Sequence, residues 1–293
     1  MCLSGARRVL CFSLLYATLL ICRCNLQPEY SADSGFIFSV VDVGQGLAQI
    51  GVMGDSAVVW DIGSGRQYRK WLDAYNDLGE PRIVAIIISH NHEDHYGGLS
   101  RLGKDINWNG RLITSPHEDT AFLRSRTGVW KNRIDFEFAV QDDTLELFES
   151  VLIRCLWPPE SIEVPTPVTG LNVNRYSMVF AVEHGMNSLL ITSDIDTVSQ
   201  RYISQAYSYG LSSDILIAPH HGSAGSADQL FFAYVGASLS IISCGERNPY
   251  GHPSRKMIDE LLNLGSDILY TYIDGTVDLR SNEFYWSRAG LRY

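Results

Sequence analysis

Residues 89–98 read Ser89-His90-Asn91-His92-Glu93-Asp94-His95-Tyr96-Gly97-Gly98 and follow directly on residues 82–88, an apolar run rich in β-branched side chains. That run predicts a strand buried on both faces. Three imidazoles and two carboxylates leave the strand end together, where their desolvation is costly unless a cation neutralises them. Because imidazole nitrogen and carboxylate oxygen are good ligands for zinc, iron or manganese, the stretch predicts a divalent metal site rather than a solvated polar turn.

The spacing of these side chains divides them into two pairs. His90 and His92 are two residues apart in extended chain, so they point the same way and can bind one ion. Asp94 and His95, at the turn into the next expected helix, can reach a second ion. The pattern therefore predicts two divalent ions, with zinc favoured and manganese as the alternative.

The pattern H-x-H-x-D-H followed by Gly97-Gly98 resembles the metallo-β-lactamase superfamily. Further motifs, taken in order over roughly residues 36–280, are similar to the hydrolase domain of ComEC-type DNA-uptake proteins: Asp42-Val43-Gly44-Gln45-Gly46, Asp61-Ile62-Gly63-Ser64-Gly65, Thr192-Ser193-Asp194, His220-His221-Gly222-Ser223 and Asn248-Pro249-Tyr250-Gly251-His252-Pro253. The resemblance implies an α/β fold, the αββα sandwich, with metal ligands on loops at one rim.

The resemblance also implies roles for individual residues. Asp194 matches the aspartate that bridges two ions, although an aspartate here could instead cap the following helix. The second ion would take one histidine of the 220–221 pair; we expect His220 to be the ligand and His221 to support a ligand or to face the substrate. Asp42 and Asp61 are expected to orient histidine rings.

A histidine that usually completes the first metal's ligand set in this superfamily is missing. The two histidines between the motifs, His117 and His184, are expected at the surface. Asn174, in an Asn-x-x-Ser element, or a water would then complete the set. His252 is expected at the same rim, where it could bind a phosphate oxygen, protonate a leaving group or only cap a helix. Ser223 and Ser226 give a weaker signal for an anion site.

Residues 1–24 have the features of a signal peptide, with a basic start and an apolar run too short to span a bilayer. Cleavage would leave a tether over 25–35 and the hydrolase domain over 36–293. A lipoprotein anchored at Cys22 and an uncleaved anchor are the alternatives. In each case the expected location is secreted or periplasmic.

Two cysteines, Cys155 and Cys244, lie outside the signal segment. An oxidising compartment permits a disulfide between them. Both lie in or beside apolar strand-like stretches, however, where a lone cysteine usually behaves as a small buried hydrophobe. The sequence favours the second interpretation.

The charge balance limits how the chain could bind nucleic acid. The chain has 23 lysines and arginines against 33 acids, a net charge of −10. Removing residues 1–24 would take away three arginines and no acids, and moves the balance to −13. Phosphate neutralisation supplies most nonspecific affinity for nucleic acid. Without a basic run, a shallow salt dependence is expected, with a slope of about one to three in log affinity against log salt.

The pattern of apolar residues predicts a first half rich in strands and a second half in which strands and helices alternate. Strands are expected at 36–43, 47–52, 57–61, 82–88, 112–114, 134–140, 151–156, 176–183, 188–193, 215–218, 238–243, 268–272 and 276–279, and helices at 67–78, 197–209, 227–234 and 254–264. A surface loop is expected from Trp157 to Gly170, where prolines forbid regular strand pairing. About 260 residues suffice for one large domain of two sheets with helices outside.

The functional hypothesis is a secreted metallo-hydrolase that cleaves phosphoester bonds with a hydroxide activated by two divalent ions. Asp94 and Asp194 would orient that nucleophile, and His252 or His221 would assist the leaving group. The resemblance implies DNA or a nucleotide ester as substrate. Two alternatives stay open: a hydrolase of a small lactone, amide or ester, and a non-catalytic metal-binding interaction domain. No protein partner is indicated.

Overall fold

The structure is a computed structural model that describes residues 35–293 except 105, 162–172, 289–290 and 293. The expected signal peptide, all of the tether but Gly35, and most of the proline-rich loop lie outside the described residues. Within the described part of the chain, no helix has the length and apolar character needed to cross a membrane.

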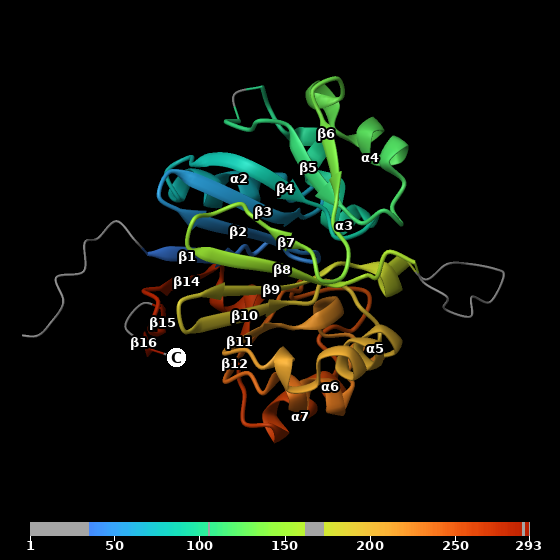
Figure 1. The fold of residues 1–293 in the computed structure, drawn as a ribbon, viewed down its shortest axis with the longest axis vertical. Helices are drawn as coiled ribbons and strands as arrows, with labels where there is room; N and C mark the ends of the chain where they lie inside the picture. The colour runs from blue at the N-terminus through green and yellow to red at the C-terminus, as the bar shows by residue number, and fades with distance from the viewer. Residues whose placement is uncertain (1–34, 105, 162–172, 289–290, 293) are drawn as a thin grey trace, which may run out of the picture. The chain divides into compact units, whose positions relative to one another are not determined.

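Two sheets form the centre of the domain (Figure 1). Among the described residues the first has nine strands in the order β16-β15-β14-β1-β2-β3-β4-β5-β6. Its members are β1 (Phe36–Val40), β2 (Ala48–Met53), β3 (Ser56–Ile62), β4 (Arg82–Ile87), β5 (Arg111–Thr114), β6 (Asp135–Phe138), β14 (Val277–Ser281), β15 (Trp286–Arg288) and β16 (Leu291–Arg292).

The second sheet has seven strands over the described residues, in the order β13-β12-β11-β10-β9-β8-β7. They are β7 (Thr144–Leu145), β8 (Val151–Trp157), β9 (Val179–His184), β10 (Asn187–Ile191), β11 (Ile215–Ile217), β12 (Leu239–Ile242) and β13 (Asp267–Tyr270). Strands β3 to β6 are parallel to one another, and so are β10 to β13. The carboxyl ends of each parallel set therefore meet at one edge of its sheet.

Alternation along the strands builds three apolar layers. In β4, Ala85 and Ile87 pack between the sheets, whereas Ile83 and Ile86 pack on the outer face beneath helices. This strand is buried on both faces, as its unbroken apolar run predicts. The layer between the sheets also contains Phe36, Phe38, Val182, Ile217 and Leu279.

Helices cover both outer faces (Figure 1). On the first sheet these are α2 (Tyr68–Asp77), α3 (Glu93–Tyr96) and α4 (Thr120–Arg126); on the second they are α5 (Thr197–Tyr207), α6 (Gln229–Val235) and α7 (Arg255–Asn263), and a short α8 (Thr271–Asp274) follows β13. Side-chain caps at Asp119, Asp196, Asp228 and Ser254 begin four of these helices. The αββα sandwich is confirmed.

Several element boundaries differ from the sequence prediction. The strand expected over 176–183 begins at Val179, because residues 173–176 form a 3-10 turn. The strand expected over 268–272 ends at Tyr270, whose backbone N–H donates to the Asp274 carboxylate across α8. The strand expected over 188–193 ends at Ile191, before Ser193 adopts a φ of +45°. Helix α8 and the short strands β7, β15 and β16 were not predicted.

The two cysteines of the domain behave as the apolar context predicts. Cys155 and Cys244 are free thiols among the described residues, and both are fully buried. Cys155 packs between the sheets, and Cys244 packs beneath the helices on the second sheet.

Candidate metal centre

The ends of five strands supply the site. The end of β4 leads into His90 and His92, β3 ends beside Asp61, β10 leads to Asp194, β11 to the His220–His221 pair, and β12 to Ser243. Four site residues have left-handed backbone conformations, with φ of 53°, 45°, 50° and 54° for Asp61, Ser193, His220 and His221. Such conformations are uncommon for non-glycine residues and cluster where the surrounding structure fixes a functional geometry.

Two groups of side chains in the described chain can each hold a metal ion. His90, His92 and Asp194 form the first, and Asp94, His95 and His221 the second; within each group the ligand atoms lie within 4.8 Å of one another. Nitrogen and carboxylate oxygen donors in this arrangement suit zinc or manganese. Five of the six residues were predicted as ligands from the sequence. The sixth, His221, was predicted as a catalytic residue.

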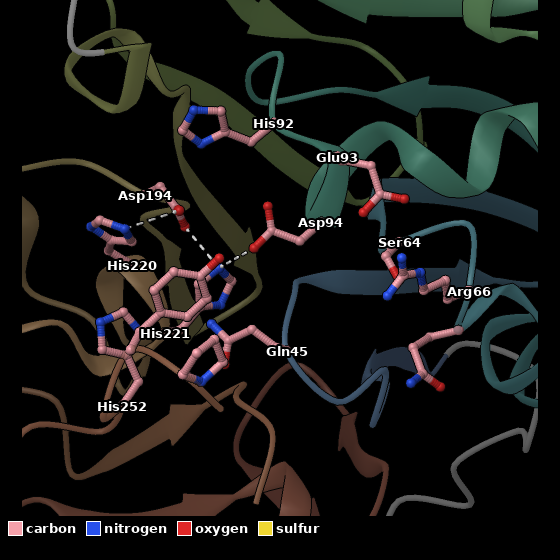
Figure 2. Close-up of a pocket in the computed structure, with 13 residues that line it drawn as sticks. Gln45, Ser64, Arg66, His92, Glu93, Asp94, Asp194, His220, His221 and His252 are labelled. Atoms are coloured by element: carbon pink, nitrogen blue, oxygen red, sulfur yellow. Dashed lines mark ion pairs between the residues drawn. The ribbon is translucent and has the colours of Figure 1, made fainter. Parts of the chain in front are cut away.

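Asp194 lies between the two groups (Figure 2). Its Oδ1 is 3.2 Å from His95 Nε2 and 3.5 Å from His221 Nε2. Its Oδ2 faces the other way and is 3.9 Å from His90 Nε2. One oxygen thus faces each group, which is the arrangement that a bridging carboxylate requires.

Neighbouring acceptors fix the ring nitrogens of His95 and His221. His95 Nδ1 lies 2.7 Å from Asp61 Oδ2, and His221 Nδ1 lies 2.9 Å from the Ser243 carbonyl oxygen. A carbonyl and a carboxylate can only accept, so each Nδ1 carries the proton. In the neutral ring, Nε2 then presents a lone pair to the site. Burial lowers the pKa of both rings, but the neighbouring carboxylates, Asp194 foremost, together raise it by more, so metal binding would release a proton from each.

A relay through Ser89 fixes His90 in the same way. The Ser89 hydroxyl donates its single proton to Asp61 Oδ2 at 2.7 Å, so it can only accept from His90 Nδ1 at 3.0 Å. His90 Nε2 then carries the free lone pair. One carboxylate, that of Asp61, thus orients a histidine of each ligand group.

Four of the ligand atoms have no hydrogen-bond partner among the described residues. His90 Nε2, His95 Nε2, His221 Nε2 and Asp194 Oδ1 are all buried and without a hydrogen-bond partner. Each orphaned buried polar atom costs about 1–3 kcal/mol. Four such atoms that converge on two points are the pattern expected of ligands, so the residues present fit two divalent ions.

The protonation of the site follows from its charges. Burial by itself would raise the pKa of Asp194, but the facing rings of His221 and His95 hold that pKa well below its usual range. Burial and the neighbouring His95 lower the pKa of His90. Burial, the buried His221 and His220 lower the pKa of His252 to about 4. At neutral pH, Asp194 is therefore ionised, whereas His90 and His252 are neutral.

The two adjacent histidines differ in their surroundings. His221 is 3% exposed and its Nε2 lies 3.4 Å from Asp94 Oδ2, inside the second group. His220 is 29% exposed, its Nε2 lies 3.6 Å from Asp194 Oδ2, and it belongs to neither group. The Asn174 amide nitrogen lies 3.1 Å from that same Nε2. The geometry favours His221 over the predicted His220 as ligand, and the assignment stays a prediction.

Some expectations for other polar residues require correction. His184 was expected at the surface but is 1% exposed, because it ends β9 and its Nδ1 lies 2.8 Å from the buried Ser281 hydroxyl. His117 is exposed, as expected. Asp42 does not contact a histidine; its carboxylate accepts from Lys70 Nζ at 2.7 Å. The contact expected of Asp61 is confirmed.

An open cavity of about 860 Å³ gives access to the ligands. His92, Asp94, Asp194, His220, His221 and His252 line it together with Gln45, Arg66 and Tyr250. Figure 2 shows the histidines and Asp194 on one side and Arg66, Ser64 and Glu93 on the other. Ser223 and Ser226 do not line this cavity.

The turn that carries His252 is held by Asn248. The Asn248 Oδ1 accepts from the His252 backbone N–H at 3.0 Å, and its Nδ2 donates to the His252 carbonyl at 2.6 Å. The imidazole itself lies against Tyr250, with ring centroids 5.6 Å apart. His252 thus lines the cavity, as predicted, without joining either ligand group.

Sequence reasoning missed three residues that shape the site. Ser89 orients His90, the Ser243 carbonyl orients His221, and Glu118 lies buried close by and accepts a hydrogen bond from the Asn91 backbone. Ser89 opens the quoted motif, so its place before a ligand histidine was a usable signal. Ser243 and Glu118 come from distant segments, and nothing in the sequence around them indicated a role in the site.

Residues 48–174 match the model of the metallo-beta-lactamase superfamily. Over this part of the chain the sequence is similar to the metallo-β-lactamase superfamily, and the described residues share its fold. Among curated proteins, the domain is similar to competence protein ComA of Neisseria gonorrhoeae, 25% identical over 90% of this chain and 37% of ComA. It is also similar to recombination protein 2 of Haemophilus influenzae, 27% identical over 90% of this chain and 30% of that protein. The chain thus spans about a third of the length of these relatives.

Solved structures share the fold of this domain. The metallo-β-lactamase fold protein YhfI from Bacillus subtilis superposes with a TM-score of 0.54 at 14% identity, over 83% of this chain and 99% of YhfI. Tm1679, described as a metal-dependent hydrolase of the β-lactamase superfamily, gives a TM-score of 0.52 at 14% identity, over 82% of this chain and 98% of Tm1679. At these identities the likeness concerns the fold alone.

Proposed function

We propose that this domain is a metal-dependent phosphodiester hydrolase that acts on DNA or a nucleotide ester. The observation that carries the proposal is the position of Asp194, with one carboxylate oxygen toward each of two groups of orphaned ligand atoms. Sites with two metal ions recur in enzymes that displace groups at phosphorus. The names of the two curated relatives, a competence and a recombination protein, support a nucleic-acid substrate.

In this proposal each ion has a defined ligand set. His90, His92 and Asp194 hold the first, and Asp94, His95, His221 and Asp194 hold the second. When bound, the ions stabilise charge on the phosphoryl oxygens and lower the pKa of water to provide a nucleophile. The proposal takes zinc as the metal and manganese as the alternative. It includes action outside the cytoplasm, expected from residues 1–24.

The side chains around the ligands supply orientation and charge. Asp94 is ionised, because the neighbouring His221 and His95 lower its pKa more than burial raises it, and its carboxylate is 30% exposed to the cavity. It can orient an attacking water by accepting a hydrogen bond from it. His252 is neutral and can hydrogen-bond a phosphate oxygen or the leaving group. Arg66, across the cavity, offers a guanidinium fork that matches phosphate geometry.

A substrate panel tests the proposal. Purified protein loaded with zinc, and separately with manganese, is assayed on single-stranded DNA, duplex DNA, bis(p-nitrophenyl) phosphate and a lactone. We expect phosphodiester cleavage that His90→Ala and Asp194→Ala each abolish while circular dichroism stays unchanged, because the ligands lie on loops and the core lies in the strands. Lactone opening without diester cleavage would favour the alternative that the acidic charge balance suggests. Full activity in Asp194→Ala would exclude the bridging role.

A further inference from the structure

A second cavity, of about 200 Å³, lies next to the metal centre. Arg66 and Glu93 line both cavities, so the two share a wall. Three arginines line the second cavity: Arg66 from the loop after β3, Arg101 from the 3-10 turn after α3, and Arg126 from the end of α4. We call these three residues the arginine subsite.

The three guanidinium groups are not neutralised within the described chain. None of them forms an ion pair with any described carboxylate, whereas eight other lysines and arginines do: Arg69, Lys70, Arg111, Arg154, Arg175, Arg201, Arg255 and Arg288. All three arginines are exposed, and water can stabilise each charge by itself; what distinguishes them is that the fold gathers three unpaired arginines at one cavity in a chain that has 33 acids for 23 basic residues.

Packing around the subsite supports its basic groups and leaves their charge intact. The Arg126 guanidinium lies 4.7 Å from the centroid of the Phe122 ring, and Phe122 in turn packs edge-on against Tyr96, which lines the cavity. A cation over an aromatic face is oriented while it keeps its charge. The one acid on the wall, Glu93, accepts the Gly65 backbone N–H at 3.0 Å. Glu93 is therefore committed to fixing the loop that carries Arg66.

We propose that the arginine subsite binds a backbone phosphate of a nucleic-acid strand whose neighbouring phosphodiester lies at the metal centre. Guanidinium groups match the planar, bidentate geometry of phosphate. At about 200 Å³ the cavity is well above the roughly 10–15 Å³ needed to hold one water, so it has room for a phosphate group. Arg66 lines both cavities and so marks the path between them. This inference rests on the proposed function and assigns to its substrate a second anchoring point.

The arginine subsite also changes the expectation, drawn from composition, that the domain has no cluster of basic residues for nucleic acid. The linear sequence shows no basic run, yet the fold brings together arginines that lie 35 and 25 residues apart. Each phosphate neutralised on a single strand adds about 0.7 to the slope of log affinity against log salt. One or two phosphates held in the subsite would thus contribute about 0.7 to 1.4 of that slope.

A binding experiment in EDTA tests the subsite without any cleavage. Fluorescence anisotropy with 5′-fluorescein-(dT)8 is measured at three salt concentrations for the wild type and for the double variant Arg101→Gln/Arg126→Gln. Arg280→Gln is the matched control, because Arg280 is an exposed arginine on β14 that lines neither cavity. We expect the double variant to bind about tenfold more weakly, with a slope lower by about 0.7 to 1.4, and the control to match the wild type. Equal affinity and slope in the double variant would overturn the inference.

Hydrolysis of bis(p-nitrophenyl) phosphate separates this inference from the proposed function. That small diester reaches only the metal centre, so the zinc-loaded double variant should cleave it with a KM within about twofold of the wild type, whereas KM for (dT)8 rises. If the zinc-loaded wild type does not cleave the diester but still binds (dT)8 in a way that depends on the arginines, the proposed hydrolase function is rejected and the arginine subsite is supported. The single variants Arg101→Gln and Arg126→Gln replace the double variant if its melting temperature falls.

Discussion

Replacing Asp61 with asparagine tests how the protein orients its metal ligands. The Asp61 carboxylate accepts three hydrogen bonds, from His95 Nδ1 at 2.7 Å, the Ser89 hydroxyl at 2.7 Å and the Ser89 backbone N–H at 2.8 Å. Asparagine keeps the shape and tolerates the φ of +53° at this position. The change therefore alters hydrogen bonding and charge more than folding.

The amide can be placed in two ways, and neither preserves the network. If its NH₂ faces His95, that ring must present a bare Nδ1 and carry its proton on Nε2, where it blocks the metal. If the NH₂ faces the Ser89 backbone N–H, two donors meet in a buried site, which costs about 1–3 kcal/mol. Substituting a residue that orients a metal ligand typically weakens metal affinity by about 10- to 100-fold, equivalent to about 1.4–2.7 kcal/mol.

The assay is zinc affinity, measured by competition with a chromophoric chelator, for the wild type, Asp61→Asn and Asp42→Asn. Asp42 is the matched control, because it also begins an Asp-x-Gly motif but its carboxylate pairs with Lys70 and contacts no histidine. We expect Asp61→Asn to weaken at least one zinc by about 10- to 100-fold and Asp42→Asn to leave both affinities unchanged. Equal losses in the two variants, or none in Asp61→Asn, would refute the orienting role.

The remaining predictions concern four other residues. His221→Ala should bind one zinc fewer than the wild type by elemental analysis, whereas His220→Ala should keep both; the reverse result would restore His220 as the ligand. His252→Ala should lower turnover by about two to four orders of magnitude without changing metal content, since His252 joins neither ligand group, and loss of an ion would show that it is a ligand. Burial raises the pKa of Glu118 from 4.5 to about 7, so the folded state binds more protons than the unfolded state between these values, and stability falls as pH rises through that window. Between pH 5 and pH 8, the free energy of urea unfolding of metal-free protein should fall by up to about 3 kcal/mol more in the wild type than in Glu118→Gln. The site histidines titrate in both proteins and only Glu118 differs, so equal changes in the two would contradict this.

The metal motif was predictable because its information is local. The motif after the buried strand contains four of the six residues in the two ligand groups. Asp194, at the end of a later strand, is the fifth. Periodicity likewise predicted most strands and the two-sheet sandwich. Boundaries failed where a tertiary contact ended a strand, as at Tyr270.

The choice between adjacent histidines could not be made from the sequence. Alternation along a strand predicts which of two neighbours faces the site, but His220 and His221 both have left-handed backbones, with φ of 50° and 54°. Asp42 and Asp61 begin similar motifs, and only the pairing of β3 with β4 brings Asp61 to the ligand loop. The arginine subsite joins three separate segments, so only the fold reveals it.

The most direct test of the account is a zinc titration of metal-free protein, with cleavage of a 5′-labelled single-stranded oligonucleotide measured at each ratio of zinc to protein. The account predicts that cleavage rises with zinc and reaches a plateau at two equivalents, and that Asp194→Asn gives no such rise. No cleavage of any phosphodiester at two or more equivalents of zinc, or cleavage that is independent of zinc and manganese, would contradict the proposal that this domain is a phosphodiester hydrolase with two metal ions.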